Sequence, residues 1–228
     1  MEADKMIDLG FLTSIFPYLI QGLVFTLELS VLGFVLGFFL GVTLAVLRLS
    51  NDKLLSSISS LYIDLIRGTP LLVQILIIYF GLPSLGLYFD PITAGVLAIG
   101  LNSGAYQAEI IRSGIKSIPK ENIESAQSLG LTDFKIYKFV VLPLAIRNVI
   151  PALTNELVTL VKDSSLVSVI GVAELTRRGE YIIAWTFRPF EVYLLVAMIY
   201  FVICYFLSKL SSKLEKKLAV PGFFSSKE

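Results

Sequence analysis

Long apolar stretches alternate with short polar ones along this chain, and five of them have the length and composition of membrane spans. A spanning helix needs about 20 mainly apolar residues. The five stretches cover residues 16–47, 54–80, 92–115, 149–172 and 192–210. We therefore expect an all-α membrane protein whose five transmembrane helices form a single transmembrane domain over residues 1–228. The first stretch is too long for a hydrocarbon core of about 30 Å, so it must tilt, bend or protrude.

The first span carries small residues on one face and one carboxylate. Gly33, Gly37 and Gly41 recur every four residues, a spacing that lets two membrane helices pack closely. Glu28 lies in the same span. A carboxylate inside a membrane is expensive, so Glu28 is a candidate substrate-binding residue. The alternative is that Glu28 reaches the outer membrane interface.

The second span is interrupted by Arg67-Gly-Thr-Pro70. Pro70 removes a backbone hydrogen bond, and Gly68 loosens the same turn. Irregular backbone at membrane depth is tolerated only where it is buried or faces a watery cavity. Thr69 and Gln74 are therefore candidate substrate-binding residues. An ordinary proline kink, with Arg67 reaching the interface, is the alternative.

Polar side chains recur on one face of the third span and on one face of the fourth. Asn102, Tyr106 and Glu109 are spaced i, i+4 and i+7, which places them on a single helix face. The fourth span has two adjacent polar rows: Glu156, Thr159 and Asp163 in one, and Asn155, Thr159 and Lys162 in the other. The predicted substrate-binding residues of these spans are Asn102, Tyr106, Glu156, Thr159, Lys162 and Asp163. Hydrogen bonds or ion pairs that only hold the helices together are the alternative.

Residues 117–143 form the long polar passage between the third and fourth spans. Pro119 suits the first turn of a helix that Gly130 ends, and Thr132 suits the N-cap of a second short helix that Leu142-Pro143 ends. We expect these two helices to lie across the membrane surface. Small side chains at Ser125, Ala126 and Gly130 would allow another protein to approach closely.

Charge predicts which way the chain is oriented. Most of the 19 Lys and Arg residues fall in the segments after the first and third spans and in the C-terminal tail. The positive-inside rule places these segments in the cytoplasm and the N-terminus outside.

Only 16% of the residues are charged, against about 25% in soluble domains. The net charge of +1 gives no reason to expect nucleic-acid binding.

The residue inventory argues against chemistry carried out by this chain. There is no histidine, and the single cysteine, Cys204, lies in an apolar run. We therefore expect no metal site, no catalytic residues and no cofactor bound by this chain. The chain also lacks a G-x-x-x-x-G-K-[ST] phosphate loop, so any ATP must be bound by another polypeptide.

Three motifs carry a resemblance to a known family. Residues 124–143 resemble the cytoplasmic EAA loop of permease subunits in ATP-binding-cassette importers: Glu-Ala-Ala, Gly four residues on, then Ile-x-Leu-Pro. Here the loop has Ser125 in place of the first alanine and Val140 in place of isoleucine. Residues 67–74 and 102–109 resemble the polar amino-acid subfamily, whose substrates include histidine, glutamate, glutamine, arginine and opines.

The resemblance implies a type I importer fold, partners and a location. Two ATPase subunits would bind ATP and Mg²⁺ and would dock on the EAA loop. The residues that would couple to them are Glu124, Ser125, Ala126, Gly130, Leu142 and Pro143. A second permease subunit, identical or a close paralogue, would complete the pathway, and an extracytoplasmic amino-acid-binding protein would deliver the substrate. The location implied is the prokaryotic inner membrane.

The balance of charges on the polar faces suggests a substrate. A zwitterionic amino acid needs a cationic group or a helix N-terminus for its carboxylate and an anion for its ammonium group. Lys162 or the turn at Gly68-Thr69 could serve the carboxylate, and Asp163 or Glu156 the ammonium. The excess of carboxylates favours arginine, lysine or histidine. The alternatives are glutamine or glutamate in the same importer class, and a secondary transporter without an ATPase.

Overall fold

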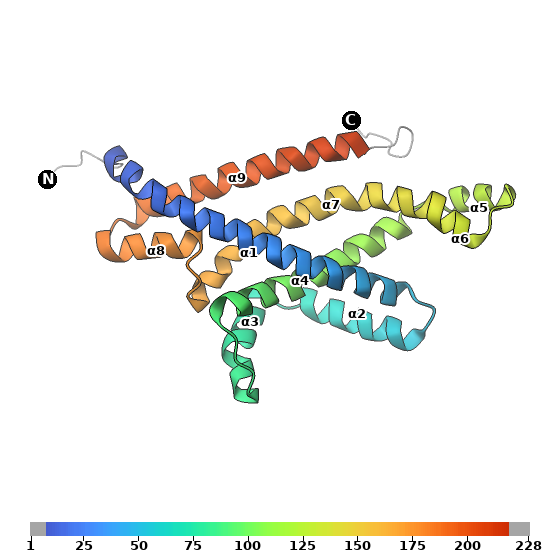
Figure 1. Cartoon of the computed structure of the whole chain (residues 1–228), viewed down its shortest axis with the longest axis horizontal. Helices are drawn as coiled ribbons and strands as arrows, with labels where there is room; N and C mark the ends of the chain where they lie inside the picture. The colour runs from blue at the N-terminus through green and yellow to red at the C-terminus, as the bar shows by residue number, and fades with distance from the viewer. Residues whose placement is uncertain (1–7, 219–228) are drawn as a thin grey trace.

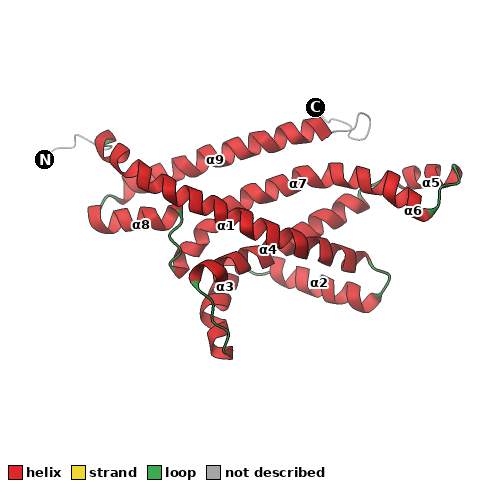
Figure 2. Ribbon diagram, viewed as in Figure 1, coloured by secondary structure: helices red, strands yellow, loops and turns green. Residues whose placement is uncertain are grey.

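The computed structural model describes residues 8–218, which are helical without any strand (Figure 1, Figure 2). The α-helices are α1 Leu9–Leu49, α2 Lys53–Arg67, α3 Leu71–Leu76, α4 Pro91–Lys116, α5 Lys120–Ser128, α6 Asp133–Ile136, α7 Leu142–Asp163, α8 Leu175–Thr186 and α9 Pro189–Leu218. Two π-helical turns, Ile77–Gly81 and Tyr137–Val141, and two 3₁₀ turns, Leu82–Leu85 and Ser164–Ile170, connect or extend them. The prediction of an all-helical chain is confirmed.

Helix α4 lies at the centre of the bundle, against α1, α2, α3 and α7. The predicted small-residue face of α1 packs on it. A Cβ atom at Gly37 would lie 2.9 Å from Gln107 Nε2, and one at Gly41 would lie 3.1 Å from the Gly104 carbonyl oxygen. The two backbones approach so closely that only glycine fits at these positions.

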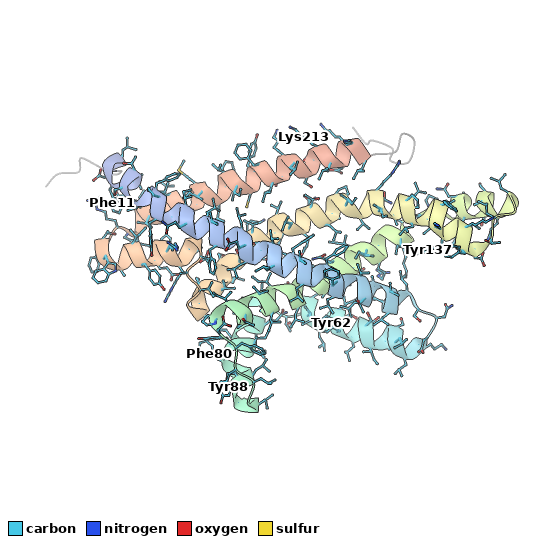
Figure 3. All side chains as sticks on the ribbon, viewed as in Figure 1. Phe11, Tyr62, Phe80, Tyr88, Tyr137 and Lys213 are labelled. Atoms are coloured by element: carbon cyan, nitrogen blue, oxygen red, sulfur yellow. The ribbon has the colours of Figure 1, made fainter. Side chains whose placement is uncertain are left out.

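The second predicted span is broken where the sequence indicated. α2 ends at Arg67, and the helical segment from Leu71 to Leu85 is bent by 102° relative to it. This segment projects from the bundle beside α4 (Figure 1). Phe80 lies on this projecting segment and Tyr88 on the non-helical segment that follows it (Figure 3), and both side chains are exposed.

Asp90 caps the N-terminus of α4. Its hydrogen bonds from Thr93 hold the pKa of this carboxyl group below its usual range.

By length and hydropathy alone, the described residues have fewer spanning helices than the five that the sequence predicts. Three helical segments are long and apolar enough to cross a membrane, namely Leu9–Leu49, Asp133–Ile170 and Pro189–Leu218, and a fourth is added if the bent pair is one span. α4 does not meet this test, because its polar row lowers its mean hydropathy. A helix that is surrounded by other helices does not need the apolar surface that lipid requires.

The connection between α4 and α7 corrects one boundary of the predicted pair of short helices. α5 ends at Ser128, just before the predicted stop at Gly130, whose φ is +76°. The Gly130 N–H donates to the Gln127 carbonyl, and the Leu131 N–H donates to the Ala126 carbonyl, as in a Schellman cap. However, Leu142-Pro143 does not end the second helix. The π turn at Tyr137–Val141 accommodates Pro143, and the helix runs on from α6 into α7.

The α1–α2 loop and helices α5 and α6 lie at one end of the molecule, and α8 and the start of α1 lie at the other (Figure 1). Near this second end, the buried Glu174 caps α8 through the N–H groups of Thr176 and Arg177. Its carboxylate also accepts a hydrogen bond from the Tyr200 hydroxyl of α9. The basic segments after the first and third predicted spans lie toward the α5–α6 end (Figure 1).

Candidate functional site

One polar row of α7 faces the helix break and α4 across a cavity of about 520 Å³. The lining side chains come from the α2–α3 break, from α4 and from α7 with the turn after it. They are Arg67, Gly68, Thr69, Pro70, Leu71, Asn102, Tyr106, Glu156, Thr159, Asp163 and Leu166. The cavity is thus polar, carries two carboxylates and is built on three separate segments.

The structure brings together most of the predicted substrate-binding residues. Those that line the cavity are Thr69, Asn102, Tyr106, Glu156, Thr159 and Asp163. The other three predicted residues lie elsewhere. Gln74 lies behind the wall, and Glu28 and Lys162 line separate clefts.

Gln74 supports the wall by replacing a missing backbone donor. Pro70 has no N–H, so the Ile66 carbonyl lacks the donor that a regular helix would supply. The Gln74 side-chain amide donates to the Ile66 carbonyl at 2.8 Å and to Thr69 Oγ1 at 2.9 Å. Gln74 Oε1 accepts from Asn102 Nδ2 at 3.0 Å, which ties the break to α4. The irregular turn is therefore a defined part of the cavity wall.

A chain of hydrogen bonds orients Glu156. Ser103 Oγ donates to Glu156 Oε1 at 2.9 Å, and Gln107 Nε2 donates to Ser103 Oγ at 2.9 Å. Gln107 Nε2 also reaches the Phe34 carbonyl at 3.1 Å, so the chain extends from α7 through α4 to α1. One oxygen of Glu156 is used in this way, and the side chain as a whole lines the cavity.

Lys162 lies on the neighbouring face of α7. It lines a different cleft, of about 360 Å³, with Tyr193 and Tyr200 of α9. Successive residues of a helix point about 100° apart, so Lys162 and Asp163 face different surroundings. The row that contains Glu156 and Asp163 therefore faces the cavity, whereas Lys162 of the adjacent row does not.

Arg67 is a cavity residue that the sequence reasoning did not name as a candidate and mentioned only in the alternative interpretation, where it reaches the membrane interface. Its guanidinium carbon lies 5.3 Å from the centroid of the Tyr106 ring, and both side chains line the cavity. The signal was present in the sequence, because Arg67 directly precedes the break that forms the wall. Arg67, rather than Lys162, is the cationic side chain among the lining residues.

Glu28 is exposed and lines a cleft of about 470 Å³ with Gln21, Asp90 and Arg178. This cleft lies near α8, at the opposite end from α5 and α6, and it does not include residues of the first cavity. Glu28 is therefore separated from the candidate substrate cavity.

The predicted coupling residues form part of an exposed surface at the end of the molecule. Glu124, Ser125, Gly130, Leu142 and Pro143 are exposed. Ala126 is not, since it is 5% exposed and packs with Ile118, Ile136, Val141 and Ala145. The small side chain at Ala126 therefore serves packing within the chain, where we expected it to face another protein.

Two apolar residues that the motif did not single out are the most exposed ones of this surface. Leu129 is 80% exposed and Phe134 is 73% exposed. They lie on either side of the Gly130 turn, at the end of α5 and the start of α6. Neighbouring apolar side chains exposed in this way are typical of a protein-binding surface.

Comparison with known proteins identifies the family. Residues 33–220 match the family described as "Binding-protein-dependent transport system inner membrane component". The chain is 42% identical over 206 residues to the glutamine transport system permease protein GlnP of Escherichia coli (strain K12), covering 90% of this chain and 94% of that protein. It is 39% identical over 203 residues to the arginine transport system permease protein ArtQ of Bacillus subtilis (strain 168), covering 89% and 93%.

Solved structures show the same fold. A chain of the structure titled "Crystal structure of an amino acid ABC transporter with histidines" superposes with a TM-score of 0.90 at 43% identity, covering 93% of this chain and 99% of that one. A chain from an inward-facing MetNI methionine transporter superposes with a TM-score of 0.73 at 21% identity, and this likeness concerns the fold alone. The chain belongs to the inner membrane components of binding-protein-dependent transport systems, as a multi-pass permease of the bacterial inner membrane with the type I importer fold and the polar amino-acid subfamily that its motifs predicted.

Proposed function

We propose that this chain forms the translocation pathway of an ATP-driven importer for polar amino acids and that the cavity between α3, α4 and α7 binds the substrate. The observation that carries the proposal is the combination of two carboxylates, one guanidinium and several uncharged polar groups around one cavity of about 520 Å³. Relatives named for glutamine and arginine, and a similar structure titled with histidines, support the substrate class.

The cavity offers a partner for each charged group of an amino acid. Arg67 binds the α-carboxylate, a task for which the planar guanidinium is suited. One of the two acids, Glu156 or Asp163, binds the α-ammonium group. The other acid is left for the side chain of the substrate.

This second acid favours a basic side chain, as in arginine, lysine or histidine. Two unit charges 4 Å apart attract by about 4 kcal/mol at an effective dielectric constant of about 20, which a neutral side chain cannot supply. Glutamine is the second candidate, because the relative GlnP is named for it and because Asn102 and Thr159 can hydrogen-bond an amide.

The energy comes from outside this chain. Two partner ATPase subunits bind ATP and Mg²⁺ and dock on the surface formed by α5 and α6, where Leu129 and Phe134 are exposed. A second permease subunit completes the pathway, and an extracytoplasmic amino-acid-binding protein delivers the substrate. ATP can shift the permease between its inward-facing and outward-facing conformations only if the ATPase subunits bind these two conformations with different affinity. The contact with the α5–α6 surface is therefore where ATP binding and hydrolysis act on this chain.

The basic segments after the first and third spans lie toward the α5–α6 end, which supports an orientation with the N-terminus outside and the C-terminus in the cytoplasm. In this arrangement the five spans are α1, the bent pair of α2 and α3, α4, α7 and α9. α4 is shielded from lipid by its neighbours, which explains how a helix with a polar row can cross the membrane.

Uptake by the full importer complex in proteoliposomes tests the proposal. With labelled arginine and glutamine offered at equal concentration, we expect ATP-dependent uptake with preference for arginine. Preference for glutamine would overturn the assignment of a basic substrate, and uptake without ATP would overturn the importer class.

Variants at the two acids test the site itself. We expect Glu156→Gln and Asp163→Asn each to reduce arginine uptake at least tenfold, which corresponds to about 1.4 kcal/mol, while the ATPase subunits stay bound. Glu180→Gln is the matched control, because Glu180 pairs with Arg177 on α8 away from the cavity. Uptake that is normal in both acid variants would mean that these residues only hold the helices together.

A further inference from the structure

A second cavity, of about 650 Å³, lies next to the candidate substrate cavity on the side of α5. Its lining includes Glu109, Ser113, Arg147 and Asn155. Arg67 and Tyr106 line both cavities, and they are the only two lining residues that the two have in common. These two side chains therefore form the partition between the cavities.

The contact that closes the partition is a weak one. Arg67 Cζ lies 5.3 Å from the centroid of the Tyr106 ring, in a cation–π arrangement at an exposed site. Within residues 8–218, no carboxylate lies within 4.0 Å of the Arg67 guanidinium. Glu109, which follows Tyr106 by one helical turn, is already bound by Arg48 at 3.0 Å and by Arg112. Arg67 is thus free to leave the ring without breaking an ion pair.

The two sides of the partition belong to different helices. Arg67 is the last residue of α2, directly before Gly68 and the 102° bend, whereas Tyr106 lies in the middle of the central helix α4. Arg67 has a long, exposed side chain, so rotation about its own side-chain torsions moves the guanidinium away from the Tyr106 ring. The hydrogen bonds of Gln74 that tie the turn to α4 stay in place during this movement.

We propose that Arg67 and Tyr106 are the inner gate of the translocation pathway, separating the substrate cavity from the cavity that opens toward the cytoplasm. The inference rests on the proposed function, because it takes the first cavity as the site of the substrate. While the gate is closed, the guanidinium repels a cationic substrate from the exit. The α-carboxylate of a bound amino acid competes with the Tyr106 ring for Arg67, so a loaded site weakens the gate.

Cysteine accessibility in the full importer complex tests the gate without relying on transport. Cys204→Ser removes the native thiol, and a reporter is added on each side: Thr159→Cys in the substrate cavity or Ser113→Cys in the second cavity. A membrane-impermeant cationic methanethiosulfonate reagent is then applied to the cytoplasmic face of inside-out vesicles without nucleotide or substrate. We expect Ser113→Cys to react at least about tenfold faster than Thr159→Cys.

Opening variants complete the test. Tyr106→Ala should accelerate the labelling of Thr159→Cys about tenfold, equivalent to about 1.4 kcal/mol, and leave the labelling of Ser113→Cys unchanged. Arg67→Ala should act in the same direction, and Tyr106→Phe, which keeps the ring, should not. Equal labelling rates for the two reporters in the parent protein, or no acceleration by either alanine variant, would overturn the gate.

The outcome is separable from that of the proposed function. If arginine uptake and its dependence on Glu156 and Asp163 hold while the labelling rates do not change, the substrate site stands and the gate is wrong. If labelling behaves as expected but uptake favours another substrate, the gate stands and the substrate assignment is wrong. A variant that misfolds is recognised by an altered rate at Ser113→Cys.

Discussion

Replacement of Gln74 by leucine tests how the broken second span is stabilised. Gln74 is 8% exposed, and its side chain joins the Ile66 carbonyl of α2 to Asn102 of α4. Gln74→Leu keeps the approximate volume but leaves the buried Asn102 Nδ2 without this acceptor. It leaves the Ile66 carbonyl only the longer contacts from Thr69, at 3.4 Å and 3.5 Å. An orphaned buried polar group costs about 1–3 kcal/mol. An interhelical hydrogen bond in a membrane protein contributes about 0.6 kcal/mol on average and about 1.7 at most.

The expected loss in the free energy of unfolding is the sum of the two effects, roughly 1.6–4.7 kcal/mol. Titration of the purified chain with sodium dodecyl sulfate from mild detergent, followed by circular dichroism, measures it. Gln127→Leu is the matched control, because Gln127 is exposed on α5, and its effect should stay within about 0.5 kcal/mol.

A double-mutant cycle with Asn102→Leu isolates the bond between the two side chains, and the two single losses should not add up in the double variant. A Gln74→Leu variant as stable as the control, with losses that add, would refute the view that this amide replaces the donor missing at Pro70.

Three further substitutions test packing, backbone conformation and docking. Gly41→Ala forces a methyl group into the backbone of α4 and should lower the free energy of unfolding by about 1–3 kcal/mol in the same titration, whereas Gly81→Ala, whose nearest neighbour would be 3.7 Å away, should be tolerated. Gly130→Ala places a side chain at a φ of +76° and should cost about 1–2 kcal/mol; Gly130→Asn should cost less, and equal losses would contradict the backbone argument. Leu129→Asp combined with Phe134→Asp should weaken binding of the ATPase subunits by at least about 2 kcal/mol in a pull-down titration while the thermal stability of the chain is kept.

The sequence predicted those features that depend on local geometry. Gly68 and Pro70 identified the break, because proline removes a backbone donor wherever it stands in a helix. The spacing of Gly37 and Gly41 identified the packed face of α1, and Gly130 identified the end of α5. Each of these follows from the chemistry of a few neighbouring residues, without knowledge of the tertiary arrangement.

The features that the sequence reasoning missed depend on which helices meet. Periodicity defines the faces of α7 but not which face meets α4, so Lys162 and Asp163 could not be separated by counting alone. Arg67 could be assigned to the cavity only once the 102° bend placed it beside Tyr106. Pro143 indicated a helix end, but the π turn before it keeps the helix continuous. The count of five spans also depended on α4, whose polar surface is explained only by its central position.

The uninterrupted helical rod from Asp133 to Ile170 has a mechanical consequence. Its 38 residues correspond to a length of about 57 Å, with the α6 surface at one end and Glu156 and Asp163 in its second half. Because no loop lies between them, a sideways push on Phe134 is passed along the helix toward the two carboxylates. A tilt of about 3° at the outer end would carry the two carboxylates, about 33–44 Å away, by about 2 Å relative to α4, so the cavity changes shape when the outer end of the rod is moved.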